Sequence, residues 1–312
     1  MLECIEHKAL NKSMLGYFRL VRLPNVFTAI ADILAAFTIV NASQSESAGY
    51  GSLLALCGAS AGLYLAGMAF NDVADRDEDA RVRPNRPIPS KQVSLAGARL
   101  CGAGLMALGL MLSFSVGALS VYCALCLAAF ILVYDFGLKG IVILGPVTLG
   151  FCRFFNMEMG LSAGNQHFIG FSAGHWQTQW APSLAVGIYA AGLTAFSAQE
   201  EAGKQLRAIV IGWIFCGSGI LLAGLCGAYL WAWIALGPLT ALLMYLTLRL
   251  KRLGTPHAAR DLVRAGVMGI CVLDCGMILG FAGLAAWPFA LLCVTLLIPG
   301  FLLAKRLAQK EA

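Results

Sequence analysis

Long apolar stretches, separated by short polar segments, run through the whole chain. Runs of about 18 to 25 apolar residues have the length that a helix needs to cross the hydrocarbon core of a bilayer. We expect ten transmembrane helices, at 21–41, 52–72, 95–117, 119–136, 141–163, 180–198, 206–227, 229–249, 264–285 and 287–304. A lipid-facing sheet edge would leave backbone groups without hydrogen bonds, so helices are expected throughout. The predicted fold is an all-α, polytopic membrane bundle, with residues 1–312 as a single integral membrane domain.

Composition and the placement of charge support this interpretation. Hydrophobic residues make up 59% of the chain and charged residues 12%, which excludes an ordinary soluble domain. Lys and Arg occur in alternate polar segments, so both termini are expected in the cytoplasm. The basic segments are the N-terminus, 73–94, 137–140, 199–207, 250–263 and the C-terminus. We expect a multi-pass protein of a bacterial inner membrane, surrounded by lipid and without a nucleic-acid partner.

A dense charge cluster follows the second apolar run. Asp72, Asp75 and Asp79 are spaced i, i+3 and i+7, which places them within about 60° of one helix face, beside Asn71. These carboxylates repel one another near a helix C-terminus, where the helix dipole favours a cation. Oxygen ligands of this kind suit Mg²⁺, which takes a few carboxylates and leaves positions for phosphate. The sequence therefore predicts Mg²⁺ as the cofactor, with these four residues as metal ligands.

Two other interpretations of the cluster are an EF-hand and a solvated loop of mixed charge. An EF-hand that begins at Asp75 needs Gly at its sixth position and Glu at its twelfth, where this chain has Ala80 and Arg86. That interpretation fails. The solvated loop stays open, although the helical spacing and the position at a membrane helix end argue against it.

Basic residues and prolines follow the acids. Arg81, Arg83, Arg86 and Lys91 are interrupted by three prolines, which stop the helix and stiffen the segment. A divalent cation beside guanidinium groups is a common way to hold a diphosphate. The cluster can hold the polar head of a molecule whose remainder lies in the bilayer, and a prenyl diphosphate is such a molecule.

These residues also resemble a known family. The stretch "NDVADRDEDARVRPNRPIPS" resembles the first aspartate-rich motif, NDxxDxxxD followed by RPxRPI, of the UbiA superfamily of intramembrane prenyltransferases. The stretch "LVRLPNVFTAIADILAA" resembles the first helix of those proteins, and "RLPNVFT", "CRFFNMEMGLSAG" and "SAQEEAG" are most similar to the Ebo-type branch. The resemblance implies nine helices around a central cavity that opens to lipid, with 287–304 as an additional helix.

The resemblance also implies roles for individual residues. Asp72, Asp75 and Asp79 would act in catalysis, and with Asn71 they would hold the first metal and the diphosphate. Further contacts to the diphosphate are expected from Arg22, Asn25, Arg86, Tyr134, Lys139 and Lys204. The second acidic motif of the family is altered here, because its position reads Ser197-Ala198-Gln199-Glu200-Glu201. Glu200 and Glu201 are expected to take the place of its aspartates as metal ligands.

One basic residue lies within an apolar run. Arg153 is near the middle of the fifth predicted helix, where a charge needs a polar cavity or a partner. Two roles are open: a structural ion pair with Asp32 or Asp274, and a catalytic role in acceptor binding. Asn156 is a further candidate for the cavity. The aromatic residues that are candidates to line it, or simply to pack in the core, are Phe70, Phe130, Tyr134, Phe154, Phe155 and Phe196.

The function expected from the sequence is Mg²⁺-dependent transfer of a polyprenyl group from a prenyl diphosphate to an unidentified lipophilic or small polar acceptor. A transporter or flippase of an amphipathic metabolite is one alternative, because ten helices and an intramembrane Arg also fit it. The acids lie at a helix end, however, whereas transport sites lie near the midplane. The second alternative is a protein that binds a prenyl diphosphate without turning it over, because the second acidic motif is altered.

Overall fold

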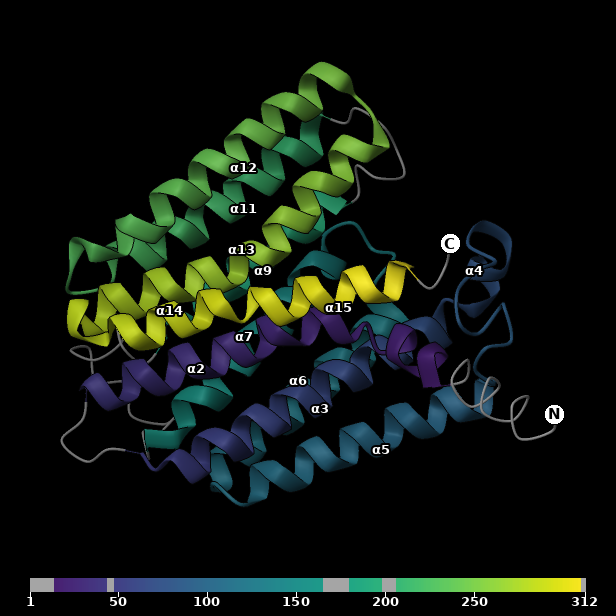
Figure 1. Cartoon of the computed structure of the whole chain (residues 1–312), viewed down its shortest axis with the longest axis horizontal. Coiled ribbons are helices and arrows are strands. Elements are labelled where there is room, and N and C mark those ends of the chain that lie inside the picture. Colours follow the sequence, from purple (N-terminus) through teal and green to yellow (C-terminus); the bar gives the residue numbers. More distant parts are fainter. Residues whose placement is uncertain (1–13, 44–47, 165–179, 198–205, 310–312) are drawn as a thin grey trace.

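All regular structure among the described residues of this computed structural model is helical (Figure 1). The structure describes residues 14–43, 48–164, 180–197 and 206–309. The helices are α2 (Val26–Ser43), α3 (Tyr50–Ala74), α4 (Arg76–Val82), α5 (Leu95–Phe114), α6 (Ala118–Val133), α7 (Leu144–Leu161), α9 (Ala181–Ser197), α11 (Leu206–Leu225), α12 (Trp233–Leu253), α13 (Pro256–Ala282), α14 (Trp287–Thr295) and α15 (Leu297–Gln309). Two shorter elements matter for the site: the 3₁₀ turn η1 (Leu23–Asn25) before α2, and the π-helical turn η2 (Tyr134–Leu138) after α6.

The expected membrane bundle is confirmed, and the count of ten spans is approximate. Among the described residues, eight helical segments are long and apolar enough to cross a membrane. Of the other two predicted spans, α9 is apolar but has 17 residues, and α7 carries the charged residues Arg153 and Glu158. Every predicted segment coincides with one of these ten segments.

The ninth predicted helix begins earlier than expected. The start was placed at 264 because charged residues precede it, but α13 begins at Pro256. The Thr255 side chain caps this helix by accepting a hydrogen bond from the Ala258 backbone N–H, and proline is favourable at the first helical position. The first turns of α13 therefore carry the charges that were assigned to a loop.

The last predicted helix is two helices. α14 ends at Thr295 and α15 begins at Leu297. Pro299 explains the break, because its ring would clash with the carbonyl of the residue four positions earlier, Thr295, in a continuous helix.

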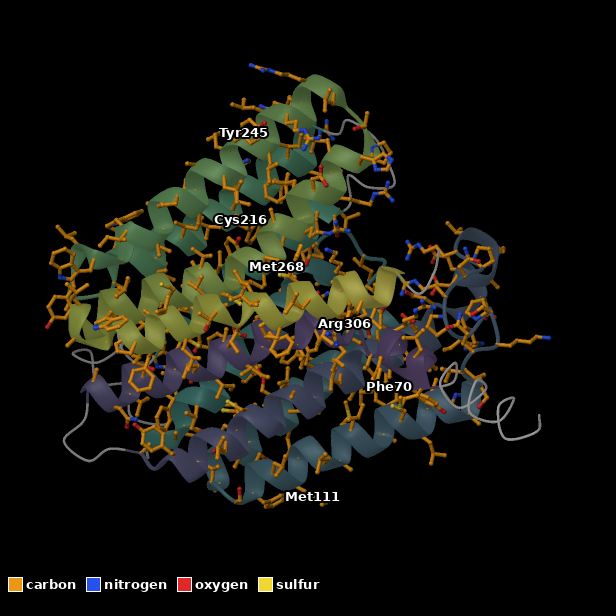
Figure 2. The ribbon with its side chains drawn as sticks, in the orientation of Figure 1. Phe70, Met111, Cys216, Tyr245, Met268 and Arg306 are labelled. Carbon is orange, nitrogen blue, oxygen red and sulfur yellow. The ribbon has the colours of Figure 1, made fainter. Side chains whose placement is uncertain are left out.

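Helix α2 lies in the middle of the bundle and is buried along most of its length. It packs against α3, α7 and α13, while α5 and α12 lie at opposite edges (Figure 1). Met111 on α5 and Tyr245 on α12 point outwards from these edges, and both side chains are more than 60% exposed (Figure 2). Apolar side chains that face outwards suit a surface in contact with lipid.

Close helix contacts are made at glycines. A Cβ added to Gly150 on α7 would lie 2.8 Å from the Gly187 carbonyl oxygen on α9, and a Cβ on Gly187 would lie 2.9 Å from the Gly150 oxygen. Backbones approach this closely only where side chains are absent, as is common between membrane helices. This contact fixes the position of α7, the helix that carries Arg153 and Asn156.

Candidate functional site

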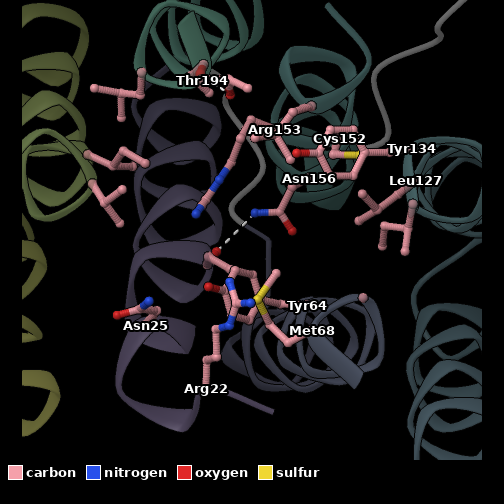
Figure 3. A pocket seen from close by; sticks show the side chains of 18 of the residues that line it. Arg22, Asn25, Tyr64, Met68, Leu127, Tyr134, Cys152, Arg153, Asn156 and Thr194 are labelled. Carbon is pink, nitrogen blue, oxygen red and sulfur yellow. Dashed lines mark hydrogen bonds between the residues drawn. The ribbon is translucent and has the colours of Figure 1, made fainter. Parts of the chain in front are cut away.

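A cavity of about 270 Å³ lies between η1, α2, α3, α6, α7, α9 and α13 (Figure 3). Its side walls are mostly apolar and include Leu127 on α6, Leu193 on α9 and Val267 on α13. Polar side chains gather at two separate places on the wall. Figure 3 shows the guanidinium groups of Arg22 and Arg153 pointing into the pocket from different sides. The expected central cavity is therefore present.

The first polar group, here called the charged end, consists of Arg22, Asn71, Asp72, Arg86 and Asp135. The Asp72 carboxylate accepts hydrogen bonds from Arg86 Nη1 at 2.8 Å and from Arg22 Nη2 at 3.3 Å. Arg22 also donates to Asn71 Oδ1 at 3.2 Å, and Asn71 Nδ2 donates to Asp135 Oδ1 at 3.2 Å. Arg22 and Asp135 line the cavity, and the other three residues lie behind them. The cavity therefore ends in a hydrogen-bonded network of carboxylates and cations.

Arg22 reaches this network from a rarely used backbone conformation. Its φ of 47° and ψ of 48° are left-handed, which costs a residue other than Gly about 1–2 kcal/mol. The Asn25 N–H donates to the Arg22 carbonyl, which closes η1. Helix α15 packs on the same turn, where a Cβ on Gly300 would lie 2.8 Å from the Pro24 carbonyl oxygen. Such strain is held by surrounding structure and is often found at functional sites.

The three aspartates of the predicted metal site do not share one continuous helix. Helix α3 ends at Ala74, Asp75 has φ −83° and ψ 0°, and Asp79 lies on α4. Asp75 forms an ion pair with Lys139, and Asp79 lies 3.6 Å from Arg83. Asp72 and Asp79 are buried, not turned towards solvent, but neither they nor Asp75 lines the cavity.

Each of these carboxylates therefore has a cation from the chain beside it. Among the described residues, no three His, Cys, Asp or Glu side chains are grouped to hold a metal ion. The donor chemistry at the charged end nevertheless suits Mg²⁺. The second oxygens of Asp72 and Asp135 are buried without a hydrogen-bond partner, and Mg²⁺ needs only one or two carboxylates beside phosphate oxygens.

A second polar group, here called the inner end, consists of Ser60, Tyr64, Arg153 and Asn156. All four line the cavity, and Arg153 lies 5.8 Å from the centre of the Tyr64 ring. Ser60 and Asn71 are eleven residues apart on α3, or about 16 Å along the helix axis. Ser60 is thus well removed from the charged end, whereas Tyr64 lies between the two polar groups and interacts with Arg22 and Asn25.

Arg153 both lines the cavity and makes the predicted ion pair. Its Nη1 lies 2.9 Å from Asp32 Oδ2, and its Nη2 donates to Thr28 Oγ1 at 2.7 Å. Asn156 Nδ2 also donates to Asp32 Oδ2, at 2.8 Å, and Asn156 Oδ1 lies 2.7 Å from Ser60 Oγ. Of the two acids considered from the sequence, Asp32 makes the direct contact with Arg153. Asp274 hydrogen-bonds to Asp32 and acts on Arg153 through its charge.

The predicted site residues fall into three groups. Those that line the cavity are Arg22, Asn25, Tyr134 and Arg153. Those linked to one another or to lining residues by hydrogen bonds or ion pairs are Asn71, Asp72, Asp75, Arg86 and Lys139. Those outside the described residues are Glu200, Glu201 and Lys204, so the altered second motif stays a prediction. Asp79 contacts Arg83 and has no hydrogen bond to either polar group, although its charge acts on Asp72.

Of the two roles left open for the aromatic residues, packing against other aromatic rings is the one found for most of them. Of the six candidates, only Tyr134 is among the cavity's lining residues. Phe130 stacks on Phe155 with ring centroids 5.4 Å apart, and Phe154 packs edge-on against Phe155. Phe70 packs near Phe136, and Phe196 packs against Trp213.

Tyr64, Ser60 and Asp135 line the cavity and were not assigned to it from the sequence. A signal for two of them was present, because Ser60 and Tyr64 lie eleven and seven residues before Asn71 and therefore share its helix face.

Comparisons with known proteins agree with this architecture. A digeranylgeranylglyceryl phosphate synthase structure has a TM-score of 0.62 and 19% identity, over 87% of this chain and 99% of that one. A UbiA homologue from Aeropyrum pernix K1 has a TM-score of 0.63 and 18% identity, over 81% and 97% of the two chains. A UbiA homologue from Archaeoglobus fulgidus bound to GPP and Mg²⁺ has a TM-score of 0.51 and 14% identity, over 92% and 98%.

At these identities the solved structures establish the fold. No curated protein sequence matches the chain. The model of the UbiA prenyltransferase family matches residues 29–260, which is most of the chain. On this match, and with the helical fold and central cavity described above, the protein belongs to the UbiA prenyltransferase family.

Proposed function

We propose that this protein transfers a prenyl group from a prenyl diphosphate to an acceptor inside the membrane, in a reaction that depends on Mg²⁺. The observation that carries the proposal is the charged end, where Arg22 and Arg86 converge on one buried carboxylate, that of Asp72, beside a cavity with apolar walls. A prenyl diphosphate has the matching shape, with one highly charged end and an apolar chain. Structures of UbiA homologues with GPP or DMAPP and Mg²⁺ are consistent with this assignment.

The cations at the charged end would bind the diphosphate. Arg22 and Arg86 have planar guanidinium groups that suit phosphate oxygens, and Lys139 adds a point charge. Asn25 and Tyr134 on the cavity wall offer further polar contacts. Asn71, Asp72 and Asp75 would hold Mg²⁺, which when bound neutralises charge on the phosphate oxygens. Because Asp72 and Asp75 are paired with cations in this structure, we expect Arg86 and Lys139 to turn from the carboxylates to the phosphates when the substrate enters.

The reaction needs stabilisation of the leaving group and exclusion of water. The bond between C1 of the prenyl group and the diphosphate oxygen breaks, and the diphosphate keeps the electron pair. The positive charges at the charged end are placed where that negative charge develops. The apolar walls keep water from the carbon centre. A nucleophilic atom of the acceptor then forms a bond to C1 and releases its proton to solvent.

The test measures diphosphate release by the purified protein in nanodiscs. The reaction contains Mg²⁺ and geranyl, farnesyl or geranylgeranyl diphosphate. A lipid extract from cells that express the protein supplies the acceptor. Asp72→Asn removes the charge that pairs with both arginines, and we expect release to fall at least about 10–100-fold, the equivalent of one charge-assisted hydrogen bond. Glu78→Gln is the matched control, since Glu78 is an exposed acid in the same segment. We expect it to leave release unchanged.

Other outcomes would support other functions. Diphosphate release that survives both Asp72→Ala and Asp75→Ala would contradict the proposal. Binding of geranyl diphosphate with Mg²⁺ but without any product would indicate a protein that binds without turnover. Counterflow of a labelled prenyl diphosphate across proteoliposomes with the bond intact would indicate a transporter.

We also propose an orientation. The charged end lies on the same side as the Lys- and Arg-rich segments, so both termini and the diphosphate site would face the cytoplasm. A cysteine introduced near either terminus can be tested with a membrane-impermeant thiol reagent. Modification in inside-out vesicles, but not in right-side-out vesicles, would confirm this orientation.

A further inference from the structure

The inner end of the cavity is a polar site at a distance from the expected diphosphate. Ser60, Tyr64, Arg153 and Asn156 present a hydroxyl, a phenol, a guanidinium and an amide around one part of the wall. An apolar prenyl chain gains nothing from these groups, which lose hydrogen bonds to water if a hydrocarbon covers them. The apolar side walls offer the chain a better place. The inner end is therefore available for the second substrate of a transferase.

The charge of this end constrains what it can bind. Arg153 contributes one positive charge, and the acids behind it are Asp32 and Asp274, both fully buried. The charges of all three act on one another. Asp32 is taken as ionised because its Oδ2 lies 2.9 Å from Arg153 Nη1. The three charges then sum to zero if Asp274 carries a proton and to −1 if it does not. In neither case is the end positive, so an anionic ligand would have no net attraction to it.

Hydrogen-bond acceptors without partners lie at the same place. Asp32 Oδ1 and both oxygens of Asp274 are buried and accept no hydrogen bond from any other described residue. The two carboxyl groups hydrogen-bond to each other when they share a proton, which leaves one of the three oxygens without a partner. Asp274 follows the lining residues Val263, Val267 and Ile270 on the same face of α13, one turn beyond Ile270, but it lies behind the wall and does not itself line the cavity. Unpaired buried acceptors favour a ligand that brings hydrogen-bond donors.

We propose that the inner end binds the acceptor substrate through an uncharged, hydroxyl-bearing head group, such as an alcohol or a polyol, and selects against acceptors that carry a carboxylate or a phosphate. This inference rests on the proposed prenyl transfer. Arg153 and Asn156 hold the head group at the wall, and the acids behind them keep the site from being positive. Ser60 and Tyr64 offer hydroxyls on the facing helix α3.

The experiment compares matched acceptors that differ in charge. The protein in nanodiscs is supplied with Mg²⁺ and geranylgeranyl diphosphate, together with glycerol or glycerol 1-phosphate, or with 4-hydroxybenzyl alcohol or 4-hydroxybenzoate. Prenylated product is measured by mass spectrometry. We expect the neutral member of at least one pair to give at least about 10-fold more product than its anionic partner. A preference for the anionic member of either pair, or no product from any of the four, would overturn the inference.

Variants that change the charge of the inner end test the electrostatic argument for a neutral acceptor. Asp32→Asn together with Asp274→Asn leaves Arg153 as the single charge of the three. We expect this variant to shift the preference of each pair towards the anionic member by at least about 10-fold. Asp274→Asn alone is the milder variant for use if the double variant does not fold. An unchanged preference in a variant that still binds geranyl diphosphate would refute the charge argument.

The failure of this inference is distinguishable from failure of the proposed function. Stabilisation of the protein against heat by Mg²⁺ and geranyl diphosphate reports on the charged end and needs no acceptor. If that stabilisation is present and depends on Asp72 while acceptor selectivity is absent, the inner end has been misassigned and prenyl diphosphate binding stands.

Discussion

The buried pair between Arg153 and Asp32 gives a stability prediction that can be worked from the structure. Arg153→Met keeps most of the side-chain volume but removes the charge and the contacts to Asp32 and Thr28. Asp32 is fully buried and would keep its hydrogen bonds with Asn156 and Asp274 but lose its cation. Removing one member of a buried ion pair leaves an uncompensated charge and typically costs about 3–5 kcal/mol. We expect a loss of that size in the free energy of unfolding.

Removal of both charges should cost less than removal of one. In Arg153→Met with Asp32→Asn no unpaired charge remains, so we expect the double variant to recover at least about 2 kcal/mol relative to Arg153→Met. The exposed pair between Arg249 and Asp261 is the control, because its N–O distance of 3.0 Å is similar but both side chains are over 40% exposed. Arg249→Met should cost less than about 1 kcal/mol.

The assay is equilibrium unfolding in mixed micelles, followed with a thiol-reactive dye. Several cysteines, among them Cys216 and Cys271, are fully buried and become reactive only when the bundle opens. Retained binding of geranyl diphosphate with Mg²⁺ would show that each variant starts from the native fold. A cost below about 1 kcal/mol for Arg153→Met, or a double variant no more stable than the single, would refute the argument that this pair is buried and coupled.

Further predictions concern glycine contacts and the strained turn. Gly187→Val should destabilise the bundle by about 1–3 kcal/mol, measured by the same unfolding assay, because the new side chain would separate α9 from Gly150 on α7. Gly104 is the control, because nothing lies within 4 Å of a Cβ added there. Gly104→Val should change the free energy of unfolding only through the different helix propensities of Gly and Val. Gly300→Val should raise the KM for the prenyl diphosphate at least about 3-fold with a smaller change in kcat, because α15 would press on the turn that orients Arg22. An unchanged KM in a folded Gly300→Val protein would show that α15 does not position this turn.

The helices were predictable because lipid imposes both their length and their composition. An apolar run of the right length leaves the backbone little choice but a helix. Predictions failed where a local signal opposed the run. The break after Thr295 follows from Pro299, and the early start of α13 follows from the Thr255 cap and Pro256. These signals were present in the sequence, but the predicted helix boundaries followed the hydropathy of the runs instead.

Part of the charged end was predictable, because Asn71, Asp72 and Arg86 lie close together in the chain and carry functional groups that membranes tolerate poorly without a role. Asp135 lies 64 positions after Asn71 and was missed. The aromatic lining was not predictable in the same way. Phe130 and Phe155 face neighbouring helices, yet their sequence context matches that of residues that line a cavity, because lipid, core and cavity wall all accept apolar side chains. In a bilayer, hydrophobicity alone therefore does not distinguish a residue that lines a cavity from one that packs in the core or faces lipid.

The partner of Arg153 needed the three-dimensional structure. Asp32 lies 121 positions before it in the chain, and Asp274 was an equal candidate on chemical grounds. Only the packing of α7 against α2 decides between them.

The family match ends at residue 260, but the cavity does not. Val263, Val267 and Ile270 of α13 form part of its wall, and α15 rests against the turn that carries Arg22, itself upstream of residue 29. A chimaera or minimal fragment cut at the borders of the matched segment would therefore lose part of the α13 wall of the cavity and Arg22 of the charged end. Protein engineers who exchange specificities between relatives should place their junctions in the polar connections outside both terminal helices.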